Sequence, residues 1–153
     1  MNRKEKPMKL EELTQKMQTM NQSIKHLLRE VDYQYEEYLE SVQIDESNPD
    51  EVQIMTEYLN ALKHLENVTW ALDYLEQPIA HEGTLHMNQN GRYEVDGVEL
   101  TCGSPLEVLV HDEGSEYPEW VASRIEADHG YYFVARRNLP LEGKRARIRE
   151  RKW

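Results

Sequence analysis

Apolar residues recur at alternating intervals of three and four along most of the first half of the chain, after a polar, basic stretch (residues 1–9) that we expect to be flexible. This spacing averages 3.5 residues and keeps one stripe of a helix facing a partner helix. Each stripe needs burial, and the nearest partner is the other stripe. The pattern therefore predicts a long antiparallel helical hairpin, packed like a coiled coil, over residues 10–78. The two rows are Leu10, Leu13, Met17, Met20, Ile24, Leu27 and Val31, then Ile54, Tyr58, Ala61, Leu65, Val68, Leu72 and Leu75.

The break between the predicted helices carries capping residues. Asn48 is suited to be an N-cap, Pro49 to the first helical position, and Glu51 to the acidic position of a capping box. We expect the first helix to run from about Lys9 to Gln43, and the second from this break to about Gln77.

The pattern changes beyond Gly83, where glycines become frequent and short β-type runs lie between turn signals. Asn90-Gly91 and Asp96-Gly97 are typical of tight hairpins. The runs predict a small antiparallel, SH3-like barrel over residues 83–150 that ends in a basic strand, so the fold class is α+β. The predicted strands are 83–87, 92–95, 98–100, 106–110, 120–126, 131–135 and 145–149.

The turn glycines and core positions of this half resemble an uncharacterised family of small β-domains found in Bacillota and in their phages and integrative elements. The resemblance rests on Gly83-x-Leu85, Asn90-Gly91-Arg92-Tyr93, Gly97-x-Glu99-Leu100-x-x-Gly103-x-x-Leu106-Glu107-Val108, and Trp120-x-x-Ser123-Arg124-Ile125-Glu126 with Gly130-Tyr131-Tyr132. It covers roughly residues 83–149 and implies a small barrel in a mobile-element context. The family has no assigned activity, so it transfers no functional residue.

Charge is unevenly distributed in this chain, which has a net charge of −11. The stretch from Glu30 to Glu76 contains thirteen acidic residues and one base, Lys63. The stretch from Arg136 to Lys152 contains eight bases and two acids. The ordinary interpretation of such runs is a solvated surface. A sharper one is that the acidic face attracts a basic partner. The expected contact residues are Tyr33, Glu36, Glu37, Glu40, Asp45 and Glu46.

No catalytic signature is evident. The chain has no phosphate-binding glycine loop, and Cys102, its single cysteine, is expected to be a small buried thiol rather than a nucleophile. His81, Glu82 and His86 cluster in sequence without the spacing of a metal site. We expect a non-enzymatic, cytoplasmic protein with no cofactor, no metal and, for want of an 18-residue apolar run, no membrane span.

A nucleic-acid site is the alternative that the second half offers. Aromatic residues beside arginines can stack on bases, and alternate arginines on one strand can meet phosphates. The competing interpretation, which we favour, is that the aromatics fill the core and the arginines pair with acids of the same domain. The candidates are Tyr131, Tyr132, Arg136, Arg137, Arg145, Arg147 and Arg149; the expected partners are Glu94, Asp96, Glu99, Glu107 and Glu126.

Three functions remain open at this point. The first is a phage- or mobile-element-encoded inhibitor, of the anti-defence or anti-CRISPR kind, whose acidic surface blocks a host nucleic-acid-handling protein that has a basic surface. The second is a nucleic-acid-binding accessory module, although the acidic charge makes nucleic acid an improbable partner. The third is a structural adaptor that forms a homodimer through the hairpin, because Met55, Leu59 and Leu62 beside the main row are expected to be uncovered.

Overall fold

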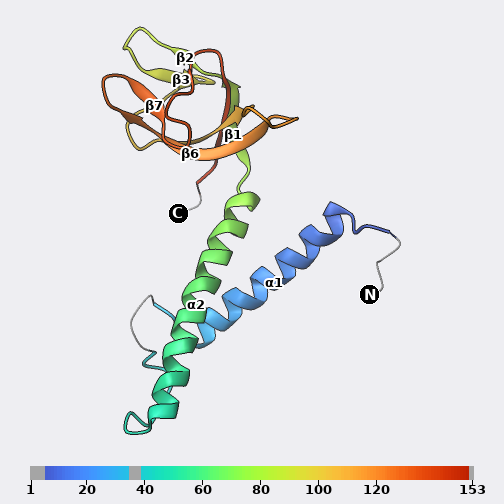
Figure 1. The fold of residues 1–153 in the computed structure, drawn as a ribbon, viewed down its shortest axis with the longest axis vertical. Coiled ribbons are helices and arrows are strands. Elements are labelled where there is room, and N and C mark those ends of the chain that lie inside the picture. Colours follow the sequence, from blue (N-terminus) through green and yellow to red (C-terminus); the bar gives the residue numbers. More distant parts are fainter. Residues whose placement is uncertain (1–5, 35–38, 152–153) are drawn as a thin grey trace. The chain divides into compact units, whose positions relative to one another are not determined.

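The computed structural model describes residues 6–34 and 39–151 and divides the chain into two compact units (Figure 1). The unit Met1–Glu76 contains both helices, and the unit Gln77–Trp153 contains all the strands of the described residues. Both helices precede an antiparallel β region, so the α+β class is confirmed.

The first helix, α1 (Leu10–Glu30), ends well before the predicted Gln43. Asp32 follows the helix with a φ of 50°, a left-handed conformation that stops helix propagation. The amide of Tyr33 then donates to the carbonyl of Leu28 at 2.9 Å, and the Ser41 hydroxyl donates to the carbonyl of Val31. The described residues between the helices are therefore turns and irregular chain, and the predicted length of this helix was wrong.

The second helix, α2 (Pro49–Glu76), begins where the capping residues predict. Asn48 Oδ1 accepts a hydrogen bond from the amide of Asp50 at 3.0 Å, which satisfies one of the amides that a helix start leaves free. Asp50 and Glu51 lie in the first turn, where carboxylates interact favourably with the helix dipole. The cap and Pro49 thus fix this boundary as the sequence indicates.

Ile24 of the predicted row on α1 is buried, but the row that α2 buries differs from the predicted one. On α2 the buried residues are Met55, Leu62 and Thr69, whereas the predicted row members Ile54 and Tyr58 are 50% and 63% exposed. The chain after α1 turns back and packs against Met55, which draws this side of α2 inward. The row that was expected to be uncovered is thus the buried one. The cluster consists of Leu39, Met55 and Leu62, with Leu28, Val31, Tyr33, Ile44, Leu59 and Leu65 packed against it.

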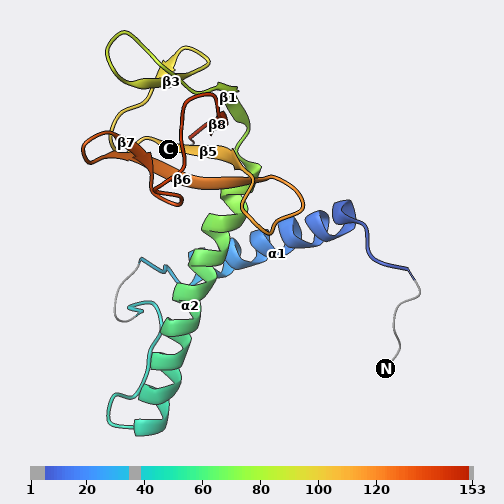
Figure 2. The same ribbon diagram turned by 45° about the horizontal axis from the view of Figure 1, so that its top comes forward.

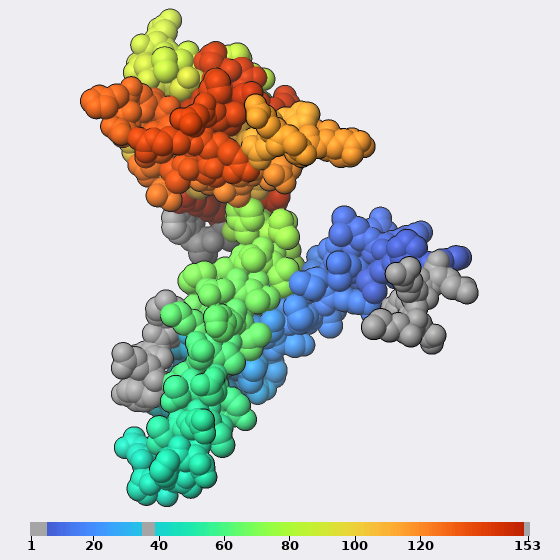
Figure 3. Space-filling model, viewed as in Figure 1, coloured from blue at the N-terminus to red at the C-terminus, as the bar shows by residue number. Residues whose placement is uncertain are grey.

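Polar groups also lie in the α1–α2 contact. Asn21 is fully buried, and its Nδ2 donates to Asp73 Oδ1 at 2.9 Å; Lys25 Nζ lies 2.6 Å from the same oxygen. Asn21 therefore lies opposite the end of α2, and Leu28 opposite its middle, so the helices run antiparallel. The N-terminal turns of α1 diverge from α2 (Figures 1 and 3).

The second unit is built from antiparallel strands in two sheets. The larger sheet has the order β1-β8-β5-β6-β7, and the smaller one the order β2-β3-β4 (Figure 2). The strand order does not show closure of a barrel, so the SH3-like form stays a prediction. The strands are β1 (Ile79–Thr84), β2 (His86–Met87), β3 (Tyr93–Val95), β4 (Val98–Glu99), β5 (Pro105–Val110), β6 (Glu119–Ala127), β7 (Tyr131–Phe133) and β8 (Arg145–Arg149).

One apolar cluster holds this unit together. Its buried members alternate along the strands with residues of the opposite face, as in a sheet with one covered side. The hairpin turns at Gly91 and Gly97 have φ values of 74° and 78°, which only glycine adopts without strain. The buried members are Leu85, Val95, Leu100, Leu106, Val108, Val110, Ile125, Phe133, Leu141 and Ala146.

Candidate binding surface

The predicted acidic contact residues fall on an irregular segment rather than on a helix face. Glu40, Asp45 and Glu46 are exposed in the segment that precedes α2. Tyr33 is half-buried and packs against the cluster of the helical unit, so it supports the fold there. Glu36 and Glu37 lie outside the described residues.

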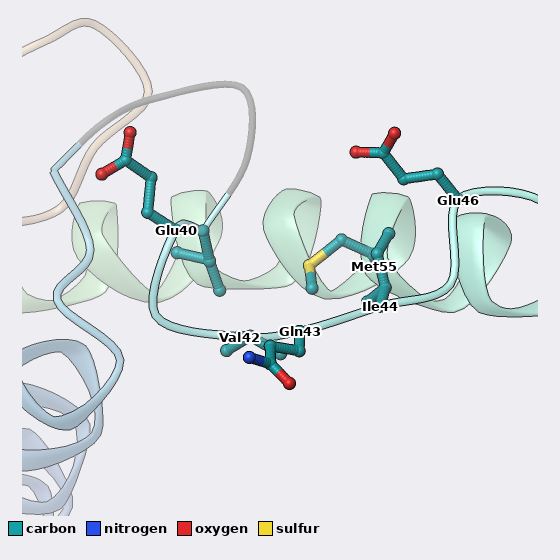
Figure 4. Close-up of a pocket in the computed structure, with 7 residues that line it drawn as sticks. Glu40, Val42, Gln43, Ile44, Glu46 and Met55 are labelled. Carbon is teal, nitrogen blue, oxygen red and sulfur yellow. The ribbon is translucent and has the colours of Figure 1, made fainter.

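A pocket of about 390 Å³ lies between this segment and the first turns of α2 (Figure 4). Its lining combines apolar side chains with Glu40 and Glu46, whose carboxylates point the same way at the two ends of the segment. Met55 from α2 and Ile44 from the segment lie between them. The arrangement suits an apolar side chain that is flanked by positive charge. The lining residues are Leu39, Glu40, Val42, Gln43, Ile44, Glu46 and Met55.

The stretch of chain that forms this pocket carries charge of one sign. No lysine or arginine occurs between Glu30 and Leu62. The side chain and the amide of Ser47 donate to Asp45, and these hydrogen bonds hold the pKa of Asp45 below its ordinary value. This carboxylate therefore stays charged even in mildly acidic solution.

The arginines of β8, in contrast, are paired with carboxylates. Arg145, Arg147 and Arg149 share the outer face of the strand, while Ala146 on the other face is buried in the core. Arg145 Nη2 lies 2.9 Å from Glu82, and both Arg147 and Arg149 donate through Nε to Glu107. The structure thus pairs the arginines of β8 with acids of the same unit.

Glu107, one of the five acids expected to pair with these arginines, is the centre of this group. It is only 3% exposed, although it lies on the outer face of β5 between two guanidinium groups. The Arg147 guanidinium lies 4.1 Å from the centre of the Trp120 ring, which covers its other side. In the sequence, Glu107 is the one acid within the apolar run Leu106–Val110, and this was the signal that could have marked it as a buried ion-pair residue.

The remaining nucleic-acid candidates are also engaged. Arg136 donates two hydrogen bonds to Asp112, which hold the pKa of that carboxyl below its usual range. Arg137 pairs with Asp128 and lies 4.4 Å from the ring centre of Tyr132. Tyr131 packs edge-on against Tyr93 beside the core. These side chains are held by their own unit rather than presented as a stacking platform.

The structure does not bring the histidines and the cysteine discussed above together into one site. His81 contacts Asp96 and His86 contacts Glu142, so the two rings have separate carboxylate partners. Among residues 6–34 and 39–151 no group of three or more histidine, cysteine or acidic side chains has the arrangement of a metal site. Cys102 is exposed, which corrects the expectation of a buried thiol; it lies in an exposed turn with Thr101 and Gly103.

Comparison with known families concerns the β unit. Residues 83–148 match a family model described as a domain of unknown function, DUF5348. The match confirms an uncharacterised domain family in the C-terminal half and runs from β1 to β8. DUF5348 accounts for less than half of the chain and leaves α1, α2 and the acidic pocket outside it. No curated protein and no solved structure matches the chain.

Within the part of the chain that the structure describes, neither helix combines sufficient length with sufficient apolar character to cross a bilayer.

Proposed function

We propose that this protein acts by binding, not by catalysis, and that the acidic pocket between residues 39–46 and α2 is its contact with a basic partner. One observation carries the proposal. The arginines of the β unit that could bind an anion are paired with carboxylates, whereas Glu40 and Glu46 lie exposed at an apolar pocket in a stretch without bases. The β unit, which we propose closes as a small SH3-like barrel, serves as the scaffold.

The chemistry of the pocket defines the partner. Carboxylates around an apolar floor complement a surface on which lysine or arginine flanks an exposed apolar side chain. Basic grooves of this kind are typical of proteins that bind nucleic acid. Occupation of such a groove excludes the nucleic acid, so the proposed outcome is inhibition of a host nucleic-acid-handling protein, as in an anti-defence inhibitor.

A charge-reversal pair with a matched control tests this function. The variant Glu40→Lys with Glu46→Lys should weaken binding to a purified nucleic-acid-handling protein, mainly by slowing association. The control, Glu113→Lys with Glu116→Lys, makes the same change in net charge at exposed positions of the β unit. It should leave binding nearly unchanged.

The readout is displacement of a fluorescent oligonucleotide from the candidate partner, measured by anisotropy. The parent should displace it, and added salt should weaken the displacement. Equal losses in the pocket pair and the control pair would show that only the total charge matters, which contradicts a role for the pocket.

A further inference from the structure

Each helix of the first unit carries a second apolar row that nothing in the described part of that unit covers. On α1 the row is Leu13, Met20 and Leu27, each at least 40% exposed and spaced by seven. On α2 it begins with Ile54, Tyr58 and Ala61 and ends at Leu75, which is 65% exposed. Exposed apolar rows of this extent are uncommon on monomeric proteins and mark interaction surfaces.

The two rows face the same side of the helix pair. On α1, Met20 and Leu27 each precede by one position a residue on the side that faces α2, Asn21 and Leu28. On α2, Ile54, Tyr58 and Ala61 each precede by one position a residue of the packed cluster of the helical unit. On both helices, the exposed row is therefore offset from the packed side by the same rotation about the helix axis, in the same direction along the chain. Because the helices are antiparallel, equal rotational offsets place both rows on one side of the pair. The two rows adjoin where the helices contact, along the C-terminal half of α1 (Figure 1), and we call the two rows together the outer face.

The spacing of the outer face selects a helix as its occupant. A seven-residue apolar repeat matches a second helix that follows it in a supercoil, and a globular surface of another kind needs no such repeat. Ile54, Ala61, Val68 and Leu75 repeat by seven on α2, as Leu13, Met20 and Leu27 do on α1.

Charge complementarity points to a second copy of this chain. Residues 6–30 contain five lysines and arginines against three acids, whereas Pro49–Glu76 contains six acids against Lys63. Two copies of α2 side by side would repel each other. The α1 helix has three bases and three acids, and Lys6 and Lys9 just before it supply the surplus positive charge that complements α2 of the other copy. The exposed Lys16 and Glu76 each lie next to the outer face, at the same end of the helix pair. A two-fold axis creates this contact twice and buries the same surface on both copies.

The size of the face is compatible with a stable pair. Each helix presents a strip about 30 Å long and about 10 Å wide, which gives roughly 600 Å² per copy. Two such faces would bury roughly 1,200 Å² in total, which is the lower end of the range of about 1,200–2,000 Å² for specific interfaces. We propose that the protein forms a symmetric dimer in which the outer faces of two helical pairs meet as a four-helix bundle, with α1 of each copy against α2 of the other.

Sedimentation of the full-length chain tests the dimer directly. At high micromolar concentration the parent should have twice the chain mass of 18.2 kDa. A parent that remains monomeric there overturns the proposal, and means that the outer face receives a helix of another protein or none. This outcome leaves the acidic pocket untouched, so failure of the dimer and failure of the proposed function are distinguishable.

Substitutions on the outer face locate the interface. Met20→Glu should weaken dimerisation by about tenfold or more, because a charge replaces an apolar contact in the seam. Its helix content at low concentration should equal that of the parent, since Met20 is exposed in the single chain. Gln22→Glu, on another side of α1, is the control and should sediment as the parent does. A Met20→Glu protein that remains fully dimeric would overturn the outer face as the interface.

Charge reversal tests which helices meet. Lys16→Glu and Glu76→Lys should each weaken the dimer, and the double variant should dimerise better than either single variant, because the contact of Asn21 with Asp73 places Lys16 and Glu76 at the same end of the helix pair. Additive losses in the double variant would contradict the pairing of α1 with α2 of the second copy.

Discussion

Glu107 shows how one residue changes the interpretation of a whole basic strand. From the sequence, Arg145, Arg147 and Arg149 form a row that could meet phosphates, and the structure confirms that they share a face. Next to this face lies the buried carboxylate of Glu107, which accepts hydrogen bonds from two of the three arginines. Glu82 and Glu107 therefore offset two of these three positive charges inside the unit, and the buried Glu107 depends on both of the arginines that cover it.

The substitution Glu107→Ala should destabilise the β unit by about 3 kcal/mol, because it leaves two mostly buried guanidinium groups without their carboxylate. The side chains of Arg147 and Arg149 are 19% and 13% exposed, so water replaces little of the lost interaction. Urea unfolding followed by near-ultraviolet circular dichroism measures the change.

The exposed pair in the same sheet provides the control. Glu82→Ala removes the partner of Arg145, and the expected loss is less than about 1 kcal/mol because both side chains remain accessible to water. If the two variants unfolded at the same urea concentration, Glu107 would have no special structural role.

At the scale of elements, the sequence predicts where helices and strands lie better than which side each one buries. The Asn48–Pro49 start of α2 and the hairpin at Gly91 follow from local chemistry, and the structure has both. The side that α2 buries does not follow from local chemistry, because apolar residues occupy adjacent positions such as Ile54 and Met55. Both rows have the same spacing, and the choice between them depends on the path of the chain after α1.

The end of α1 could not be predicted for a related reason. Residues beyond Glu30 keep helix-compatible composition and contain no proline or glycine before Pro49. The stop comes from a left-handed Asp32 and from Leu39 and Ile44 packing on α2. These contacts connect residues distant in sequence, and no local pattern encodes them. The acidic pocket forms from this same segment, so its geometry was hidden as well.

The α1–α2 contact should respond to acid through Asp73. Burial alone would raise the pKa of Asp73, but the hydrogen bonds from Lys25 and Asn21 outweigh it and hold the pKa below the ordinary value. The charged form thus stabilises the folded state. Its contribution is present above the pKa of the unfolded chain, about 3.9, and is lost as the pH falls through the lower pKa of the folded state.

Far-ultraviolet circular dichroism during thermal unfolding, repeated between neutral pH and the acid range, measures this dependence. Asp73→Asn should lower the melting temperature at neutral pH and should reduce the further decrease below about pH 4. Glu57→Gln, an exposed change on the same helix, should keep the acid dependence of the parent. An unchanged acid dependence in Asp73→Asn would assign it to other carboxylates.

At the scale of the whole molecule, the two units have unequal cores. The β unit buries a cluster of ten apolar residues, whereas the described helical unit buries a cluster of three. A helix pair with so little buried surface gains stability from whatever covers its exposed rows. The acidic charge and the uncovered apolar rows therefore occur in the same unit, and this unit, not the DUF5348 match, is where we place binding.

The distribution of charge leads to a last prediction, which concerns nucleic acid. A protein that binds an oligonucleotide must present unpaired cations to phosphates, and binding strength falls steeply with salt. Here Arg136, Arg137 and the arginines of β8 already contact carboxylates, and the net charge is −11. At physiological salt and low micromolar protein we expect no shift of a labelled oligonucleotide in a native gel.

The variant Glu113→Lys with Glu116→Lys, which lowers the negative charge without freeing these arginines, should behave in the same way. A shift by the parent that disappears in Arg145→Ala with Arg147→Ala would contradict the proposed function and favour a nucleic-acid-binding role for the β unit, because it would show that these ion pairs open in favour of phosphate.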